Sequence, residues 1–369
     1  MKILITGAKG FVGKNLIAEL RNQGFTDLLA YDVDSQPDVL NDYARDCQFV
    51  FHLAGVNRPK ETAEFMEGNF GFTSHLLSLL QKHNNKASIV VSSSTQASLD
   101  NPYGQSKKAG EDLMFDYSVQ NNVQVYVYRL PNVFGKWCKP NYNSAVATFC
   151  NNIAHNLPIQ VNDPSVDMQL VYIDDVIRSF INILKNGSQT TEKYKSVFPV
   201  HSIKLGEIVK LLKQFKESRN TLELPNFSVS FTKKLYSTYL SYLPKNEFSY
   251  LLKMNVDERG SFTEFLRTNE RGQVSINISK PKITKGNHWH HTKNEKFLVV
   301  SGNGVIRFRK VDTSEIIEYY VSSNKLEVVD IPVGYTHNIE NLGEKDMVTV
   351  MWANEIFDKD IPDTYYENV

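Results

Sequence analysis

Three glycines spaced three residues apart follow the first apolar run of this 369-residue chain, and they restrict its fold more than any other feature. The run Lys2–Thr6 is typical of a buried strand, and Asn15–Leu20 is predicted to open a helix. Between them lies Gly7-Ala8-Lys9-Gly10-Phe11-Val12-Gly13. Such glycines let the backbone turn tightly and approach a pyrophosphate, which then rests at the positive helix N-terminus. The pattern predicts a dinucleotide-binding α/β fold, and the alternative is an ordinary strand–helix turn.

The residue after the second predicted strand, Asp27–Tyr31, bears on which dinucleotide binds. Asp32 stands about 20 residues past the glycines, where an acid usually holds the adenine ribose hydroxyls of NAD. Lys9 indicates the opposite, because a cation near the ribose can bind the 2′-phosphate of NADP, and Arg58 could assist it. The residues alone leave both cofactors open.

Two further buried strands are predicted, and both end in small or hydroxyl-bearing residues. Phe49–Leu53 runs into His52-Leu53-Ala54-Gly55, where small side chains let the backbone lie against a cofactor. Ala87–Val91 runs into Ser92-Ser93-Ser94-Thr95. Because ligands of such sheets bind at the carboxyl ends of the strands, we expect one of these hydroxyls to hydrogen-bond a substrate carbonyl. A serine-rich turn is the alternative.

Tyr103 and Lys107 are four residues apart at the start of a predicted helix, Lys107–Val119, and therefore lie on one face. A cation beside a phenol favours the phenolate and lowers the phenol pKa from about 10 towards neutrality. Such a phenol can exchange a proton near pH 7, as reduction of a ketone requires. Without its context this pair is only a surface turn that enters a helix.

Together these motifs resemble the extended short-chain dehydrogenase/reductases, a family of nucleotide-sugar epimerases, dehydratases and reductases. The resemblance covers residues 1–245, including a substrate lobe from about Phe134 to Pro244. It rests on Thr6–Gly13, Asp32, His52–Gly55, Ser92–Ser94, Tyr103–Lys107, Arg129–Gly135 and Val171–Val176. It implies that Ser94, Tyr103 and Lys107 are catalytic, with Tyr103 as general acid. It also implies that Gly7, Lys9, Gly10, Phe11, Val12, Gly13, Asp32, Leu53, Ala54, Gly55, Tyr103 and Lys107 bind the cofactor. Arg129 and Asn132 are substrate-binding candidates, with a surface charge at a strand end as the alternative for Arg129.

Composition excludes several other classes of protein. Lys+Arg and Asp+Glu both number 41, so no basic surface for nucleic acid is indicated. No apolar run approaches the roughly 20 residues that span a bilayer, and the N-terminus does not resemble a signal peptide. Cys47, Cys138 and Cys150 lack metal or redox spacing, which favours thiols in a reducing cytoplasm.

From residue 246 to 369 the pattern changes to short, evenly spaced strands, which predicts a second, all-β domain of the jelly-roll type. The aromatic-rich segment Tyr236–Phe248 is a plausible joint before it. The expected strands are Ser261–Arg267, Gln273–Ser279, Lys296–Ser301, Gly304–Lys310, Glu315–Val321, Leu326–Ile331 and Met347–Trp352.

The chemistry of this second domain is expected in Gly286-Asn287-His288-Trp289-His290-His291-Thr292-Lys293-Asn294-Glu295. Two histidines one residue apart on a strand face the same side, and Pro332–His337 brings a third. The pattern resembles the two cupin motifs and implies His288, His290, Glu295 and His337 as metal ligands. Such ligands suit zinc, iron, manganese or nickel. A glycine usual before the first histidine is missing, so His291 is an alternative to His288. A metal-free cupin is the other alternative.

A reductase of this kind fused to such a cupin is similar to the bifunctional enzymes of capsular polysaccharide biosynthesis. The resemblance implies epimerisation at C3 of UDP-2-acetamido-2,6-dideoxy-β-L-arabino-4-hexulose and reduction of C4 with NADPH. The product would be the L-talo sugar, a precursor of UDP-N-acetyl-L-fucosamine. It also implies zinc and a homodimer. His291, Lys296 and Tyr335 are candidate proton-transfer residues by position. The rival interpretations are a reductase with a non-catalytic cupin and a dinucleotide sensor without turnover.

Overall fold

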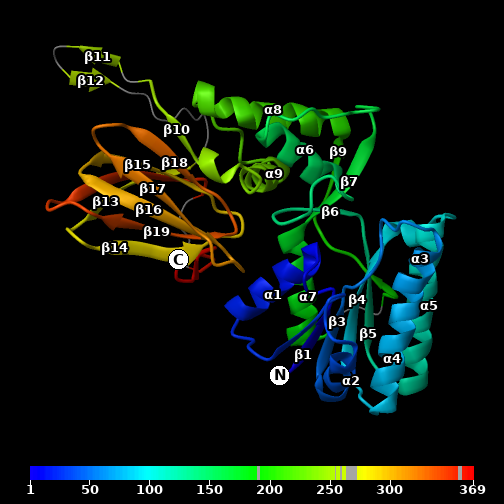
Figure 1. Cartoon of the computed structure of the whole chain (residues 1–369). Coiled ribbons are helices and arrows are strands. Elements are labelled where there is room, and N and C mark those ends of the chain that lie inside the picture. Colours follow the sequence, from blue (N-terminus) through cyan, green and yellow to red (C-terminus); the bar gives the residue numbers. More distant parts are fainter. Residues whose placement is uncertain (189–191, 254, 258–259, 263–271, 356–359) are drawn as a thin grey trace. The chain divides into compact units, whose positions relative to one another are not determined.

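The computed structural model describes residues 1–188, 192–253, 255–257, 260–262, 272–355 and 360–369 (Figure 1). The chain forms two compact units, each made of two segments. The first unit comprises Met1–Ser144 and Asp167–Ile203, and the second comprises Ala145–Val166 and Lys204–Val369. Among the described residues, no helix combines the length and the apolar character needed to cross a membrane.

The first unit is built on a six-stranded parallel sheet, which confirms the predicted α/β class. The strand order is β2-β1-β3-β4-β5-β8. The strands are β1 (Ile3–Thr6), β2 (Leu28–Tyr31), β3 (Phe49–His52), β4 (Ser88–Ser94), β5 (Val125–Leu130) and β8 (Tyr194–Lys195). Strand β1 pairs with β2 on one side and with β3 on the other. The chain therefore changes direction across the sheet at β1, and ligands of such sheets bind at this point.

Helices cover both faces of this sheet (Figure 1). On one face are α2 (Pro37–Asp46), α4 (Phe72–Lys82) and α5 (Pro102–Asn121), and on the other are α1 (Phe11–Asn22) and α7 (Ile173–Asn186). The core under the first group contains Leu40, Leu76 and Met114, packed on Val50 and Ile89 of the sheet, and all five are buried. This burial holds α5 in register with β4, and these two elements carry the predicted catalytic residues.

Shorter elements complete the first unit. They are α3 (Ala63–Phe65), a π-helical turn η1 (Met66–Gly71), a 3₁₀ turn η2 (Thr95–Ser98), and a three-stranded sheet of β6 (Asn132–Phe134), β7 (Asp167–Tyr172) and β9 (Val200–Lys204).

Helix α5 begins five residues before the predicted start at Lys107. The Asn101 side chain caps it by accepting a hydrogen bond of 2.8 Å from the Gly104 amide, and Pro102 is its first residue. Proline is favoured at that position because its missing N–H would have no helical partner. The earlier start places Tyr103 in the first helical turn and Lys107 one turn later.

The second unit contains two five-stranded antiparallel sheets, which confirms the predicted jelly-roll class. One sheet is β10 (Ser249–Leu251), β18 (Glu327–Ile331), β15 (Glu295–Ser301), β20 (Met347–Ala353) and β13 (Gln273–Ser279). The other is β17 (Ile316–Ser322), β16 (Asn303–Lys310), β19 (Tyr335–Asn341), β14 (Thr284–Trp289) and β21 (Tyr365–Tyr366). Separate from them, β11 (Asn255–Asp257) pairs with β12 (Gly260–Phe262). Most of the strand expected at Ser261–Arg267 lies outside the described residues.

Three helices pack with the barrel in the second unit: α6 (Ala145–Ala154), α8 (Leu205–Thr221) and α9 (Ser230–Leu240), followed by a 3₁₀ turn η3 (Lys245–Glu247). Phe215 of α8 contacts Tyr236 of α9 edge-to-face, and Phe227 lies 6.0 Å from Trp352 of β20, ring centroid to centroid. These three helices come from the segment expected to form a substrate lobe, and they belong to the same compact unit as the barrel. The domain boundary between residues 245 and 246 stays a prediction.

Candidate active sites

In the turn after β1, the positions of Gly7 and Gly13 leave no room for a side chain. Gly7 has a φ of +68°, and a Cβ on it would lie 2.8 Å from the amide nitrogen of Ala54. A Cβ on Gly13 would lie 2.2 Å from the carbonyl oxygen of Gly7. The turn after β1 and the turn after β3 are therefore in backbone contact. Gly10 is the N-cap of α1 and makes no side-chain hydrogen bond to the helix. The first amides of α1 therefore offer a place for a pyrophosphate.

Asp32 follows β2 directly and faces the same turn. One of its carboxylate oxygens accepts a 2.7 Å hydrogen bond from the Lys9 amide, and the other accepts 2.8 Å from the Val33 amide. The Lys9 ammonium forms an exposed ion pair with Asp34. Acid and cation thus lie together at the predicted ribose end, and this arrangement leaves the choice between NAD and NADP open.

Tyr103, Ser94 and Lys107 come together at the carboxyl end of β4. Burial raises the pKa of Tyr103, and the nearby Ser94 side chain acts to lower it. The part-buried Lys107 ammonium donates a 3.4 Å hydrogen bond to the carbonyl oxygen of Ser92. Burial lowers the Lys107 pKa to about 8, although Glu111 acts to raise it. The expected effect of Lys107 on the Tyr103 pKa stays a prediction.

Gly55 lies directly against this group. A Cβ on Gly55 would be 2.9 Å from the Lys107 ammonium and 2.7 Å from the Asn69 side-chain oxygen. The predicted cofactor segment Leu53–Gly55 therefore borders the predicted catalytic lysine. A small cavity of about 20 Å³ lies beside Lys107, with Asn69, Ser106 and Glu111 among its lining residues. A cavity of this size holds one water molecule.

Arg129 and Asn132 are placed differently from each other. The Arg129 guanidinium donates at 2.9 and 2.6 Å to the two carboxylate oxygens of Glu111 and at 3.0 Å to the Tyr194 hydroxyl. Glu111 also accepts 2.6 Å from Ser93. Arg129 therefore neutralises a buried acid one turn after Lys107. Asn132 is exposed on β6, and substrate binding by either residue stays a prediction.

The barrel brings four predicted ligands together. One ligand atom from each of His288, His290, Glu295 and His337 can be chosen so that all lie within 4.8 Å of one another. Nε2 of His290 and Nε2 of His337 each lie 3.3 Å from the same Glu295 oxygen. His288 of β14 faces both rings, with centroids 4.9 Å from His290 and 4.6 Å from His337. The residues contributed by β14, β15 and β19 thus converge on one point.

A β-bulge gives His288 its direction. The pairing of β14 with β19 shifts register between Gly286 and His288. Gly286 has a φ of +111°, and a Cβ on it would lie 2.9 Å from the carbonyl oxygen of His337. Bulges bend a strand and re-aim its side chains. This bulge contains Gly286, the glycine that comes later than is usual for the motif. The bulged strand places His288, rather than His291, in the cluster.

Electrostatics in the cluster favour a bound cation. Burial lowers the pKa of His288 to about 3, helped by His337 and His290, and burial also lowers the pKa of His337. Burial acts to raise the Glu295 pKa, but His290 and His337 outweigh it and hold that pKa well below its ordinary value. An ionised carboxylate and three imidazoles that face one point can all offer lone pairs to a cation there. Three nitrogens and one carboxylate suit a divalent transition metal such as zinc.

The other three candidates of the barrel lie outside this cluster. His291 packs on Trp289 and Tyr365, with centroids 4.6 and 5.1 Å away. Lys296 follows Glu295 on β15 and so faces the opposite side, where it pairs with Asp330 at 2.5 Å. Tyr335 is buried against Phe248, and burial raises its pKa to about 12. Their roles as proton-transfer groups stay untested.

Comparison with known proteins places the chain. Residues 3–195 match the model of the NAD dependent epimerase/dehydratase family, and residues 255–365 match the polysaccharide biosynthesis C-terminal domain. The chain belongs to the NAD dependent epimerase/dehydratase family. Within it, UDP-2-acetamido-2,6-beta-L-arabino-hexul-4-ose reductase of Pseudomonas aeruginosa is 43% identical over 365 residues, 99% of this chain and 98% of that protein.

Solved structures agree with this placement. The capsular polysaccharide assembling protein CapF from Staphylococcus aureus is 56% identical, with a TM-score of 0.70 and full coverage of both chains. RMD from Pseudomonas aeruginosa, solved with NADPH, is 23% identical over 59% of this chain and 84% of that one, with a TM-score of 0.50. That last likeness shows only the fold. The family membership and the two-part architecture inferred from the sequence are thus confirmed.

Three residues of these sites were not singled out from the sequence: Asn69, Glu111 and Asp363. Asn69 lies in the π-helical turn η1 and donates 3.0 Å to the Ser106 hydroxyl. The π-helical turn, a feature that often marks functional sites, is visible only in the structure, so the sequence carried no signal for Asn69. Glu111 stands one turn after Lys107 on the same face of α5, which was readable. Asp363, whose carboxylate accepts a hydrogen bond from the His291 amide beside the cluster, gave no local signal.

Proposed function

We propose that the chain is a bifunctional nucleotide-sugar enzyme of capsular polysaccharide biosynthesis. The reductase unit would reduce C4 of UDP-2-acetamido-2,6-dideoxy-β-L-arabino-4-hexulose with NADPH, after the cupin has inverted C3. The product would be the corresponding L-talose derivative, on the route to UDP-N-acetyl-L-fucosamine. The observation that carries the proposal is the presence of two separately built sites in a chain similar over its full length to a reductase of that sugar.

In the reductase site, the chain's residues handle the proton while the cofactor handles the hydride. The nicotinamide, when bound, supplies the hydride for C4. Tyr103 donates a proton to the oxygen that was the ketone, and Ser94, which lies near the Tyr103 phenol, orients that carbonyl. Lys107, kept below its ordinary pKa by burial, holds the ribose and lowers the phenol pKa once the cofactor screens it from water.

In the cupin site, His288, His290, Glu295 and His337 would hold the metal, which we propose is zinc. A divalent metal, when bound, polarises a carbonyl and thereby stabilises the enolate that forms when C3 loses its hydrogen. Phe297 and Phe308 pack on His337 and make that side of the site apolar. The residues that remove and return the C3 proton are not assigned.

Chemistry fixes the order of the two steps. The C3 hydrogen is acidic only while C4 is a ketone, because only then is the resulting negative charge delocalised. After reduction, C4 is an alcohol and C3 cannot exchange. The barrel therefore acts first, and the reductase traps the inverted ketone.

The choice of NADPH over NADH follows the resemblance rather than one contact. Lys9 supports it, because its ammonium is exposed and could leave Asp34 for a 2′-phosphate. The test is the ratio of kcat/KM for the two cofactors in the wild type and in Lys9→Met. We expect the wild type to prefer NADPH and the variant to lose most of that preference.

A homodimer is also proposed. Strand β13 is an edge of its sheet, and its outward Val274 and Ile278 are 57% and 55% exposed. Exposed apolar edge strands are prone to pair with another chain. Light scattering on the wild type and on Ile278→Lys would test this: a dimer that becomes a monomer supports it, and a wild-type monomer refutes it.

The rival is a reductase whose cupin is not catalytic and serves assembly or sugar binding. Two variants separate the possibilities when each is incubated with the 4-keto sugar in deuterated water without NADPH. We expect Tyr103→Phe to incorporate deuterium at C3 and His290→Ala to incorporate almost none. If neither the wild type nor Tyr103→Phe takes up deuterium, while the wild type oxidises NADPH, the cupin is passive.

A further inference from the structure

The C-terminal segment, residues 360–369, returns to β14, the strand that carries His288 and ends directly before His290. Strand β21 pairs antiparallel with β14, with Tyr366 opposite His288 and Tyr365 opposite Trp289. Farther along, the Glu367 amide donates 2.9 Å to the carbonyl oxygen of Asn287. The end of the chain is thus built into the wall of the cupin site.

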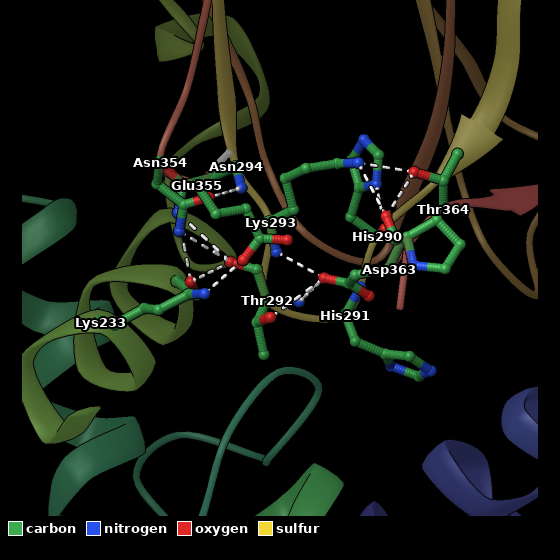
Figure 2. Close-up of polar contacts among 12 residues, drawn as sticks. Lys233, His290, His291, Thr292, Lys293, Asn294, Asn354, Glu355, Asp363 and Thr364 are labelled. Carbon is green, nitrogen blue, oxygen red and sulfur yellow. Dashed lines mark hydrogen bonds and ion pairs between the residues drawn. The ribbon is translucent and has the colours of Figure 1, made fainter. Parts of the chain in front are cut away.

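Asp363 makes the most concentrated set of contacts in this segment (Figure 2). Its carboxylate accepts hydrogen bonds from three consecutive amides, those of His291 at 3.0 Å, Thr292 at 2.8 Å and Lys293 at 2.7 Å. The Thr292 hydroxyl adds a fourth at 3.0 Å. The carboxylate therefore fixes the whole turn that joins His290 to Glu295.

The main chain of Asp363 reaches the cluster itself. Its carbonyl oxygen accepts a 2.6 Å hydrogen bond from Nδ1 of His290. A carbonyl oxygen cannot donate, so His290 must carry its proton on Nδ1. Nε2, the other ring nitrogen, faces the Glu295 carboxylate at 3.3 Å and is the nitrogen that would bind a metal. Histidine ligands usually donate their second ring N–H to such an acceptor, which fixes the ring and its tautomer.

Asp363 holds a backbone conformation that its residue type seldom adopts. Its φ is +36°, in the left-handed region. Such conformations persist only where the surroundings over-determine them, and they cluster at functional sites. The conformation turns the carboxylate to the amides of residues 291–293 and the carbonyl to His290 at the same time.

We infer that Asp363 is a positioning residue for the cupin site: its carboxylate anchors the tail to the 291–293 turn, so that its carbonyl holds the Nδ1–H of His290 and directs Nε2 towards the proposed metal site. This inference rests on the proposed metal site and adds to it a residue 73 positions away in the sequence from the ligand it orients. The opposite side of the turn is fixed by α9, where the Ser237 hydroxyl donates 2.8 Å to the carbonyl of Thr292.

The experiment measures zinc affinity and not turnover. Metal-free wild type, Asp363→Asn and Asp363→Ala would be titrated with Zn²⁺ against a chromophoric chelator. We expect binding to weaken about 10- to 100-fold in Asp363→Ala, the usual range for losing an outer partner of a histidine ligand. Asp363→Asn should fall between, because its amide group can accept from some of the three N–H groups but places a donor against the rest.

A control variant separates positioning from general loosening of the tail. Glu367→Gln weakens the ion pair that Glu367 forms with Arg309 at 2.6 Å, and it leaves the His290 contact in place. We expect its zinc affinity to stay within about twofold of wild type. Equal zinc affinity in wild type and both Asp363 variants would overturn the inference. Equal loss in Glu367→Gln would also overturn it, because then any tail contact would serve.

A second measurement needs no variant and no metal. Nitrogen-15 NMR of the metal-free wild type reports which ring nitrogen of His290 is protonated. The inference predicts a proton on Nδ1, and an unprotonated Nδ1 would contradict it even if Asp363→Ala failed to fold. If the wild type binds no zinc at all, the proposed metal site fails, whereas the tautomer result still decides the role of Asp363.

Discussion

Nε of Arg219 on α8 lies 3.1 Å from a carboxylate oxygen of Asp330 on β18, and the guanidinium makes a second contact to the same oxygen. The other oxygen of Asp330 accepts 2.5 Å from the Lys296 ammonium. Asp330 has no exposed side-chain surface, and Lys296 is 2% exposed. One buried acid thus joins a helix to the barrel and holds the lysine that follows Glu295 in sequence.

Asp330→Asn should destabilise the second unit strongly, because two buried cations would lose their counter-charge. Removing one partner of a buried ion pair costs about 3 to 5 kcal/mol. Urea unfolding followed by tryptophan fluorescence would measure the change. Glu318→Gln is the matched control, since Glu318 pairs with Arg307 on the surface, where solvent screens ion pairs so that they add little to stability. A loss under about 1 kcal/mol in Asp330→Asn would refute a stabilising role.

The same carboxylate predicts a pH dependence. Burial acts to raise the Asp330 pKa, but Lys296 and Arg219 outweigh it and hold that pKa below its ordinary value. Because the folded state binds this proton less readily than the unfolded state, the contribution to stability is complete above about pH 4 and is lost as the pH falls further. Between pH 6 and pH 3, the melting temperature should fall more steeply with decreasing pH in wild type than in Asp330→Asn. Parallel curves would exclude Asp330 as a source of acid sensitivity.

Tyr103→Phe should abolish reduction while it leaves the fold and NADPH binding intact. Loss of a positioned general acid lowers kcat about 10²- to 10⁴-fold. The ring would keep its contact with Phe65, 5.6 Å away by centroids, so no packing is lost. Tyr43→Phe on α2 removes a phenol outside the site and should oxidise NADPH at the wild-type rate. Turnover of Tyr103→Phe within tenfold of wild type would show that another group supplies the proton.

Removal of the metal should stop epimerisation without unfolding the barrel. The barrel core, with Val328, Leu298 and Trp352 buried, does not depend on the cluster. We expect dialysis against a chelator to end deuterium uptake at C3, to lower the melting temperature by a few degrees through lost ligand stabilisation, and to leave NADPH binding unchanged. Adding Zn²⁺ back should restore exchange. Full exchange in metal-free protein would instead support a cupin that works by acid–base groups alone.

Local periodicity explains why much of both sites was readable from the sequence. Tyr103 and Lys107 are one helical turn apart, and Ser94 ends the strand beside them, so parallel-sheet geometry brings them together. His288 and His290 alternate along the chain and so share a side. These relations need only the repeat of a helix or a strand.

The remaining features depend on contacts distant in sequence. The choice between His288 and His291 depended on the bulge between Gly286 and His288. That bulge requires a glycine at 286, because a Cβ there would come too close to the carbonyl oxygen of His337. The tie between Arg219 and Asp330 spans 111 residues, and no periodicity predicts it. Helices α8 and α9, from the expected substrate lobe, also belong to the barrel's unit through contacts distant in sequence. An example is Phe227, which lies between these helices and packs near Trp352 of β20.

The claim that one carbonyl serves both units can be tested in a single reaction. The wild type would be given the 4-keto sugar and unlabelled NADPH in deuterated water, and the reduced sugar analysed by NMR and mass spectrometry. The account predicts deuterium at C3 and protium from NADPH at C4. It also predicts that unlabelled alcohol product, incubated with the enzyme alone in deuterated water, takes up no deuterium at C3. A reduced sugar that keeps its original hydrogen at C3 would contradict it.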